Sequence, residues 1–367
     1  MNTHSTGATS HVKQRDDYDM DEDDADLARW PQLRGLLTVM RDTIWPVYRD
    51  ANDAAMNQQS QHAKLVRWAA MFGTAAVLCA ISELATDAPG VRHWFGIIEL
   101  LTASAALVLV GMGLWSALHP DWLLKRFIAE QCRFVKFHLL LNPALWQGKT
   151  DAEIKTAIEH TLLPLRKAGE DSSKRGSHGK EFIEEWVKWE QDKQIVGRYQ
   201  PIPGSLPVDL ARELTDYCHD KRLTVQGAYF DRQAKKRRVL EMRTRFIPPL
   251  CFFLSILVAF LHFALELLAG KPVPEAHSWL HTIAEMCIVA AAVLPVFAAG
   301  IRTYRSAHEF GRNQLRFTAM SHYLQVITVD IRTRPEDAFP LLREAEMALD
   351  AEHRAWLRLM LEAEWFG

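Results

Sequence analysis

The sequence predicts an all-α membrane protein, in which four transmembrane helices form two hairpins and long cytoplasmic helical extensions form a helical bundle. Three observations predict this fold. The 367-residue chain gathers apolar residues into four blocks that contain neither Lys nor Arg. Short links join the blocks in pairs, and basic residues concentrate on the flanks away from the links. A helix of a soluble protein is rarely apolar on all sides over such a length, so the blocks are expected to cross a membrane.

The first hairpin is predicted from the apolar blocks at 68–85 and 94–117. A helix needs roughly 20 apolar residues to cross the hydrocarbon core of a bilayer, and both blocks are close to that length. Each block contains one charged residue, Glu83 in the first and Glu99 in the second. Because the link between them is short, the two helices are expected to run antiparallel.

The second hairpin is predicted from the blocks at 246–269 and 283–301. The third block contains His262 and Glu266, and the fourth contains Glu285. The thirteen residues between these blocks again favour an antiparallel pair.

Basic residues predict the orientation. The two links contain Arg92 and Lys271, whereas sixteen Lys and Arg residues lie within about 15 residues of the other span ends. Cytoplasmic flanks carry such an excess, so both termini and residues 118–245 are expected in the cytoplasm. The acidic segment 1–28 lacks the apolar core of a signal peptide and is predicted to be a disordered tail.

The remaining segments organise the chain into units. A first membrane unit is predicted at 29–146, a cytoplasmic helical linker at 147–206 and a second membrane unit at 207–367. Helical patterns cover 120–141, 151–168, 179–194, 207–245 and 335–365, and the fourth of these runs directly into the third span. Gly-, Ser- and Pro-containing runs predict loops at 169–180 and 198–205.

The two hairpins carry similar markers at a constant spacing. Glu83 and Glu266 are 183 residues apart, each near the outer end of the first helix of its hairpin. The same offset separates Gln131-Cys132-Arg133-Phe134 from Gln314-Leu315-Arg316-Phe317. This spacing predicts an internal repeat of a two-helix membrane unit.

Two sequence runs in the second unit resemble a known family. The run Arg222-Leu223-Thr224-Val225-Gln226-Gly227-Ala228-Tyr229-Phe230, preceded by Tyr217 and followed by Gln233-Ala234, leads into the second hairpin. Glu346, Leu349, Glu352, His353 and Trp356 follow that hairpin. Together they resemble the start and end of the SLATT superfamily, the two-transmembrane effector domains associated with bacterial SMODS nucleotidyltransferases and SLOG nucleotide-sensing domains. The resemblance covers about 215–360, with the first hairpin as a degenerate second copy.

This resemblance implies an effector of a bacterial defence or stress-signalling system in the inner membrane. A nucleotide signal would trigger the membrane domain, which would permeabilise the membrane, with the lipid bilayer and further copies of the chain as partners. The sequence contains no SLOG, SMODS or TIR-like segment, so the sensor would be the helical cytoplasmic part or a separate soluble protein. The alternative is a membrane-anchored helical scaffold or sensor that recruits a soluble partner.

Ionisable residues in the spans are the first candidate site. Such residues are costly in lipid and usually face a partner or water. Glu83, Glu99, Glu266 and Glu285 are all expected toward the outer ends of the spans, where a ring of acidic residues would attract cations. The alternative is that these residues are simply hydrated at the membrane interface. His262 and Glu266 share a helical face and could form a hydrogen-bonded pair in the membrane. No second pair of ligands that would suggest a metal site is visible.

The second candidate is the basic cluster Lys235, Lys236, Arg237 and Arg238, just before the third span. It could contact anionic lipid headgroups or an anionic nucleotide. Nothing in the sequence resembles a catalytic constellation or a cofactor-binding motif, so neither enzymatic activity nor a cofactor is predicted. Direct nucleic-acid binding is not expected either, because the aromatic residues of 179–194 favour packing in the cytoplasmic bundle.

Overall fold

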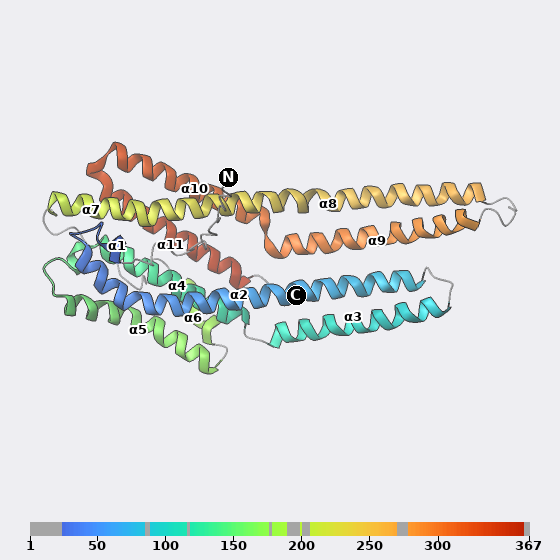
Figure 1. Ribbon diagram of the computed structural model, residues 1–367, viewed down its shortest axis with the longest axis horizontal. Coiled ribbons are helices and arrows are strands. Elements are labelled where there is room, and N and C mark those ends of the chain that lie inside the picture. The colour runs from blue at the N-terminus through green and yellow to red at the C-terminus, as the bar shows by residue number, and fades with distance from the viewer. Residues whose placement is uncertain are drawn as a thin grey trace, which may run out of the picture.

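The computed structural model describes residues 24–84, 89–115, 118–175, 178–188, 199, 206–269 and 278–362. Every regular element in these ranges is a helix (Figure 1). The elements are α1 (Asp24–Leu27), α2 (Arg34–Leu84), α3 (Pro89–Trp115), α4 (Leu118–Leu140), η1 (Pro143–Leu145), α5 (Asp151–Arg175), α6 (His178–Lys188), α7 (Val208–Cys218), η2 (His219–Thr224), α8 (Val225–Ala269), α9 (Ser278–His308), α10 (Phe310–Thr333), η4 (Pro335–Asp337) and α11 (Ala338–Glu362).

Four helices of the described chain are long and apolar enough to cross a membrane. They are α2, α3, α8 and α9, and the most apolar windows of their segments have mean hydropathies of 1.6, 2.0, 2.2 and 2.1. Only 11%, 0%, 11% and 17% of the residues in these windows are buried inside the protein. A soluble protein would bury such surface, whereas lipid solvates it. The predicted all-α fold with four membrane-spanning helices is therefore confirmed, and these helices fit a multi-pass membrane protein.

The four apolar helices lie in a row. Each hairpin packs its two helices together, α2 with α3 and α8 with α9, and the hairpins meet where α2 contacts α9. Figure 1 shows the resulting order α8, α9, α2 and α3. Small residues allow the close contact in the centre, because Ala298 is fully buried and a Cβ added to Gly300 would lie 3.8 Å from Oγ1 of Thr74.

Two very long helices connect the spans to a helical body. Helix α2 has 51 residues and α8 has 45, so they extend about 77 Å and about 68 Å at a rise of roughly 1.5 Å per residue. The apolar half of each helix belongs to the row, and its polar half belongs to the body (Figure 1). The predicted continuation of the preceding helix into the third span is confirmed for α8.

The body is built around α4. Residues 131–143 are buried without interruption, because α4 is covered by α2, α5, α6 and α11. Phe127 and Phe137 are fully buried, and each such side chain contributes roughly 1.5–3 kcal/mol by leaving water. Helix α10 packs along α8 and completes the body.

Two predicted boundaries are wrong. The loop expected at 169–180 is helical through Arg175, and α6 begins at His178. Its polar, glycine-containing sequence suggested a loop, but Gly169 is buried against α4, where an added Cβ would lie 3.3 Å from Cδ1 of Ile128. The disordered acidic tail predicted at 1–28 extends too far, because α1 begins at Asp24 and buries Leu27, and residues 1–23 of that prediction lie outside the described residues.

The two halves of the chain share one order of elements. A long helix enters the row, its partner returns, and a helix of the body follows: α2, α3 and α4 in the first half, and α8, α9 and α10 in the second. This order matches the predicted repeat of a two-helix unit. The repeat remains a prediction at the level of sequence.

Candidate functional site

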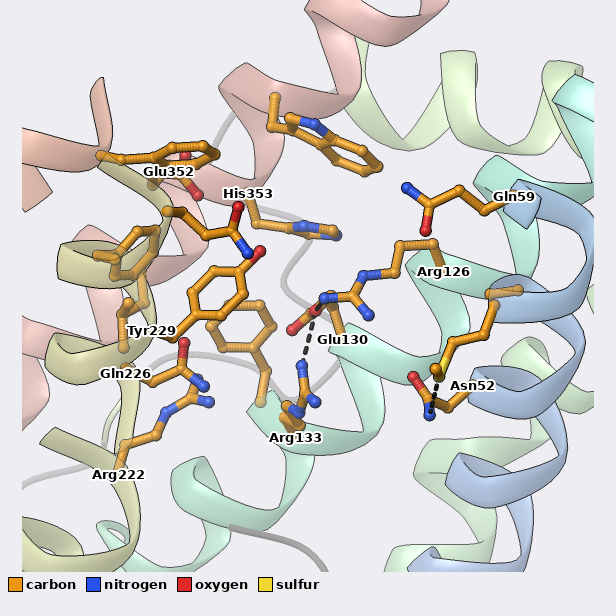
Figure 2. A pocket seen from close by; sticks show the side chains of 18 of the residues that line it. Asn52, Gln59, Arg126, Glu130, Arg133, Arg222, Gln226, Tyr229, Glu352 and His353 are labelled. Carbon is orange, nitrogen blue, oxygen red and sulfur yellow. Dashed lines mark hydrogen bonds and ion pairs between the residues drawn. The ribbon is translucent and has the colours of Figure 1, made fainter. Parts of the chain in front are cut away.

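A cavity of about 360 Å³ lies in the body, where helices of both halves converge (Figure 2). One face of each of four helices lines it, with residues spaced three or four apart as on a single helical face. Phe317 of α10 adds to the wall. The four faces are Asn52, Ala55, Met56 and Gln59 of α2; Trp122, Arg126, Glu130, Arg133 and Phe134 of α4; Gln226, Tyr229, Phe230, Gln233, Lys236 and Arg237 of α8; and Leu349, Glu352, His353 and Trp356 of α11.

The cavity lies close to the predicted membrane surface. Gln59 of α2 and Arg237 of α8 each precede the predicted start of their span, Trp68 or Phe246, by about 14 Å along the helix at roughly 1.5 Å per residue. Both long helices therefore carry cavity residues at the same distance from the membrane.

The wall formed by α4 contains a buried ion-pair network. Glu130 accepts a hydrogen bond of 2.7 Å from Nη1 of Arg133 and forms an ion pair with Arg126. Nη2 of Arg133 donates to the hydroxyl of Tyr48 at 2.7 Å. One carboxylate thus contacts two guanidinium groups in this wall.

Arg222 enters the cavity from η2, a π-helical turn that precedes α8. The wide turn places the consecutive residues Lys221, Arg222 and Leu223 in the interior. Arg222 donates to both carboxylate oxygens of Glu346 of α11, at 2.7 and 3.0 Å. Its guanidinium also lies 4.8 Å from the ring centroid of Phe137. This bidentate pair fixes the start of α8 to α11.

Helix α11 contributes a paired carboxylate and a neutral imidazole. Glu352 accepts a hydrogen bond of 2.9 Å from Nη2 of Arg316. Burial lowers the pKa of His353 to about 3, and neighbouring arginines act in the same direction. The imidazole is therefore neutral at pH 7, and it stacks on Trp356 with ring centroids 5.8 Å apart.

The helix divides the basic cluster predicted at 235–238 into two pairs. Lys236 and Arg237 line the cavity. Lys235 and Arg238 are exposed, and Lys235 bonds to Asp231 at 2.7 Å. Arg237 lies over the ring of Phe310, and burial lowers the pKa of its guanidinium. Half of the cluster thus faces the cavity and half faces outward, so both predicted roles, anion binding and lipid contact, remain open.

Several polar atoms at the cavity have no hydrogen-bond partner among the described residues. They are Oδ1 of Asn52, Nε2 of His353 and Nε of Arg237. Asn52 and His353 are each more than nine-tenths buried. Buried polar groups are normally satisfied, so these three atoms are exceptions among the lining residues, although each atom is covered by its neighbours.

The candidate acidic residues of the spans lie away from the body, toward the far end of the row. Glu83 is paired with Arg92 at 3.7 Å, and a Cβ added to Gly96 would meet its carboxylate at 3.3 Å. Glu99 is half-buried and Glu285 is exposed. Glu266 lies in α8, but its side chain is outside the described residues. The four residues come from four different helices, and an acidic ring remains a prediction.

His262 connects the two helices of the second hairpin. Its Nδ1 lies 2.8 Å from the carbonyl oxygen of Ala284. A carbonyl can only accept, so Nδ1 carries the proton in this contact. The predicted pairing of His262 with Glu266 remains a prediction, because the Glu266 side chain is not described.

Sequence reasoning named most cavity residues without recognising that they form a site. The two runs that carry the family resemblance supply one wall each, including Gln226 and Tyr229 on α8 and His353 and Trp356 on α11. Phe134 and Phe317, which end the two repeated Gln-x-Arg-Phe markers, also line the cavity. Sequence reasoning missed Asn52 and Gln59 of α2, and Trp122 and Glu130 of α4. No sequence motif marks them, and only tertiary packing brings them to the cavity.

Comparisons with known proteins identify no family. The chain matches no family model, no curated protein and no solved structure. The resemblance to the SLATT superfamily therefore remains a prediction from the residues quoted above.

Proposed function

We propose that the chain is an integral effector of the bacterial inner membrane, in a defence or stress-signalling system, that oligomerises to permeabilise the membrane or conduct ions. The helical body and both termini lie in the cytoplasm and receive the trigger. The activity is non-enzymatic. The basic flanks support this orientation, because they lie on the side of the body, away from the hairpin ends.

The row of four apolar helices is the observation that carries this proposal. A row has two open faces and encloses no path for ions. The rows of several copies of the chain, arranged around an axis, would enclose a path for ions. Gly111 of α3 is exposed with nothing within 4 Å of an added Cβ, so a helix of a second copy could approach closely there.

The two long helices support control from the body. Helices α2 and α8 continue without interruption from the cavity into the row. A change in how the body holds these helices would move their apolar halves in the membrane. Rigid elements that reach both sites can carry such coupling.

Ion flux across liposomes tests the proposal. Purified full-length protein is reconstituted at several protein-to-lipid ratios, and potassium efflux is recorded. An oligomeric pore predicts efflux that rises more steeply than the protein concentration. The double variant E83Q/E266Q is expected to reduce selectivity for cations over anions, whereas E159Q, at an exposed position of α5, leaves selectivity unchanged.

Two results would argue against the pore. Absence of efflux at every ratio would contradict it directly. Stable capture of a soluble protein by these liposomes without efflux would support the membrane-anchored scaffold instead.

A further inference from the structure

The cavity has the size of a small-molecule site, and both halves of the chain build it. Its volume of about 360 Å³ falls within the roughly 300–1,000 Å³ typical of ligand pockets. A molecule in it would touch α2 and α4 of the first half and α8, α10 and α11 of the second. It would therefore bridge the two long helices that lead into the membrane.

The charges around the cavity favour an anion. Five cationic side chains line it, and Glu130 and Glu352 are the carboxylates among the lining residues. Glu130 is shared by two arginines, Glu352 is paired with Arg316, and Arg222 is paired with Glu346. The remaining cations are Lys236 and Arg237, and in the described part of the chain no carboxylate pairs with Arg237. The lining cations are Arg126, Arg133, Arg222, Lys236 and Arg237.

Among the lining cations, Arg237 gives the strongest evidence for an anion site. Its guanidinium is partly buried over Phe310, with Nε unpartnered. A buried charge without a counter-charge is destabilising, and an anionic ligand would supply that counter-charge. Arginine suits this role because its planar fork binds phosphate oxygens in bidentate geometry.

The other walls favour a planar ring that can form hydrogen bonds. Trp122 and Trp356 meet edge to face with centroids 5.9 Å apart, and Tyr229 lies beside Gln226 on the wall formed by α8 (Figure 2). Aromatic side chains stack on planar heterocycles. Asn52 and His353 add polar side chains to the lining.

From these observations we propose that the cavity binds an organic phosphate that carries a planar, hydrogen-bonding ring, as a nucleotide does. The phosphate lies against Arg237, Lys236 and the arginines of α4, and the ring lies against the aromatic side chains of the lining. A phospholipid headgroup shares the phosphate but lacks the ring. The inference concerns binding alone, and it holds whether or not the spans conduct ions.

Thermal unfolding of purified full-length protein in detergent tests the inference. The probes are AMP, ATP, GMP and cyclic di-AMP, with adenosine, inorganic phosphate and short-chain phosphatidic acid as partial ligands. At least one nucleotide is expected to raise the melting temperature at concentrations where the three partial ligands do not. Titration calorimetry then gives the Kd of that nucleotide.

The basic cluster provides a matched pair of variants. K236Q/R237Q removes the two charges that face the cavity, and K235Q/R238Q removes the two that face outward. The first is expected to weaken nucleotide binding about tenfold or more, since one hydrogen bond to a charged group corresponds to roughly a factor of ten or more. The second is expected to leave Kd within about twofold, because it changes the net charge equally but leaves the cavity intact.

A second readout separates binding from folding. R237Q removes a partly buried charge for which the described residues supply no counter-charge, so without ligand its melting temperature should equal or exceed that of the wild type. If R237Q fails to fold, K236Q alone provides the binding test, because Lys236 is exposed.

Three outcomes would overturn the inference. The first is that no nucleotide of the panel raises the melting temperature. The second is that both double variants weaken nucleotide binding equally, which indicates attraction to surface charge. The third is that phosphatidic acid binds more tightly than every nucleotide, which assigns the cavity to a lipid headgroup.

Discussion

The buried pair between Arg222 and Glu346 yields the sharpest prediction about stability. Its side chains are 3% and 5% exposed, and two hydrogen bonds join them. Glu346→Gln leaves the guanidinium charged and buried beside Phe134 and Phe137. Breaking such a pair by removing one partner costs about 3–5 kcal/mol.

The two single variants are expected to differ. Arginine cannot lose its proton inside a protein, whereas a carboxyl left alone can gain one and become neutral. Arg222→Met therefore costs less than Glu346→Gln. The double variant R222M/E346Q removes both charges and should recover most of the stability lost in E346Q, since neutral replacements of buried pairs are often tolerated.

The wild type, the two single variants and the double variant form a double-mutant cycle. Their thermal unfolding is followed by tryptophan fluorescence in one detergent. At about 2–4 °C per kcal/mol for a domain of this size, E346Q should lower Tm by roughly 6–20 °C. Two results would refute the reasoning. A Tm of E346Q less than about 2 °C below that of the wild type would show that the pair is not buried. A double variant less stable than E346Q would show that the two charges are not coupled.

Two further predictions concern an imidazole and a glycine. The pKa of His353 is lowered to about 3 in the folded chain, whereas an unfolded histidine titrates near 6.5. Below about pH 6.5 the unfolded chain therefore binds a proton that the folded chain does not. As a result, the free energy of unfolding falls by about 1.4 kcal/mol for each pH unit of acidification. Between pH 7.5 and pH 5.5, the Tm of H353Q should therefore decrease by less than the Tm of the wild type. An identical decrease in both proteins would contradict a buried neutral imidazole. Gly148 has φ +74° with nothing within 4 Å of an added Cβ, so G148A should cost about 1–2 kcal/mol through backbone strain alone. G148N should cost less, because asparagine tolerates this conformation, and equal Tm values for G148A and the wild type would argue against it.

Several of the helical faces that line the cavity can be predicted separately from the sequence. Residues 226, 229, 233 and 237 repeat at helical spacing on α8, as do 122, 126, 130 and 133 on α4. Such spacing predicts one face of each helix. It cannot predict which faces meet, since contacts between helices depend on packing across long sequence separations. The split of the basic cluster at 235–238 has the same origin.

The sequence by itself determined the membrane class of this protein, the four spans and their pairing. Those features depend on local properties, namely the length and polarity of each block and the shortness of each link, and a helix satisfies its backbone hydrogen bonds within its own segment. Only the tertiary structure decided that the apolar helices lie in a row, that η2 places Lys221 and Arg222 in the interior, and that five helices line a basic cavity in the body. Those features depend on which surfaces exclude water from one another, and residues 301 positions apart, Asn52 and His353, line one cavity only in the folded chain.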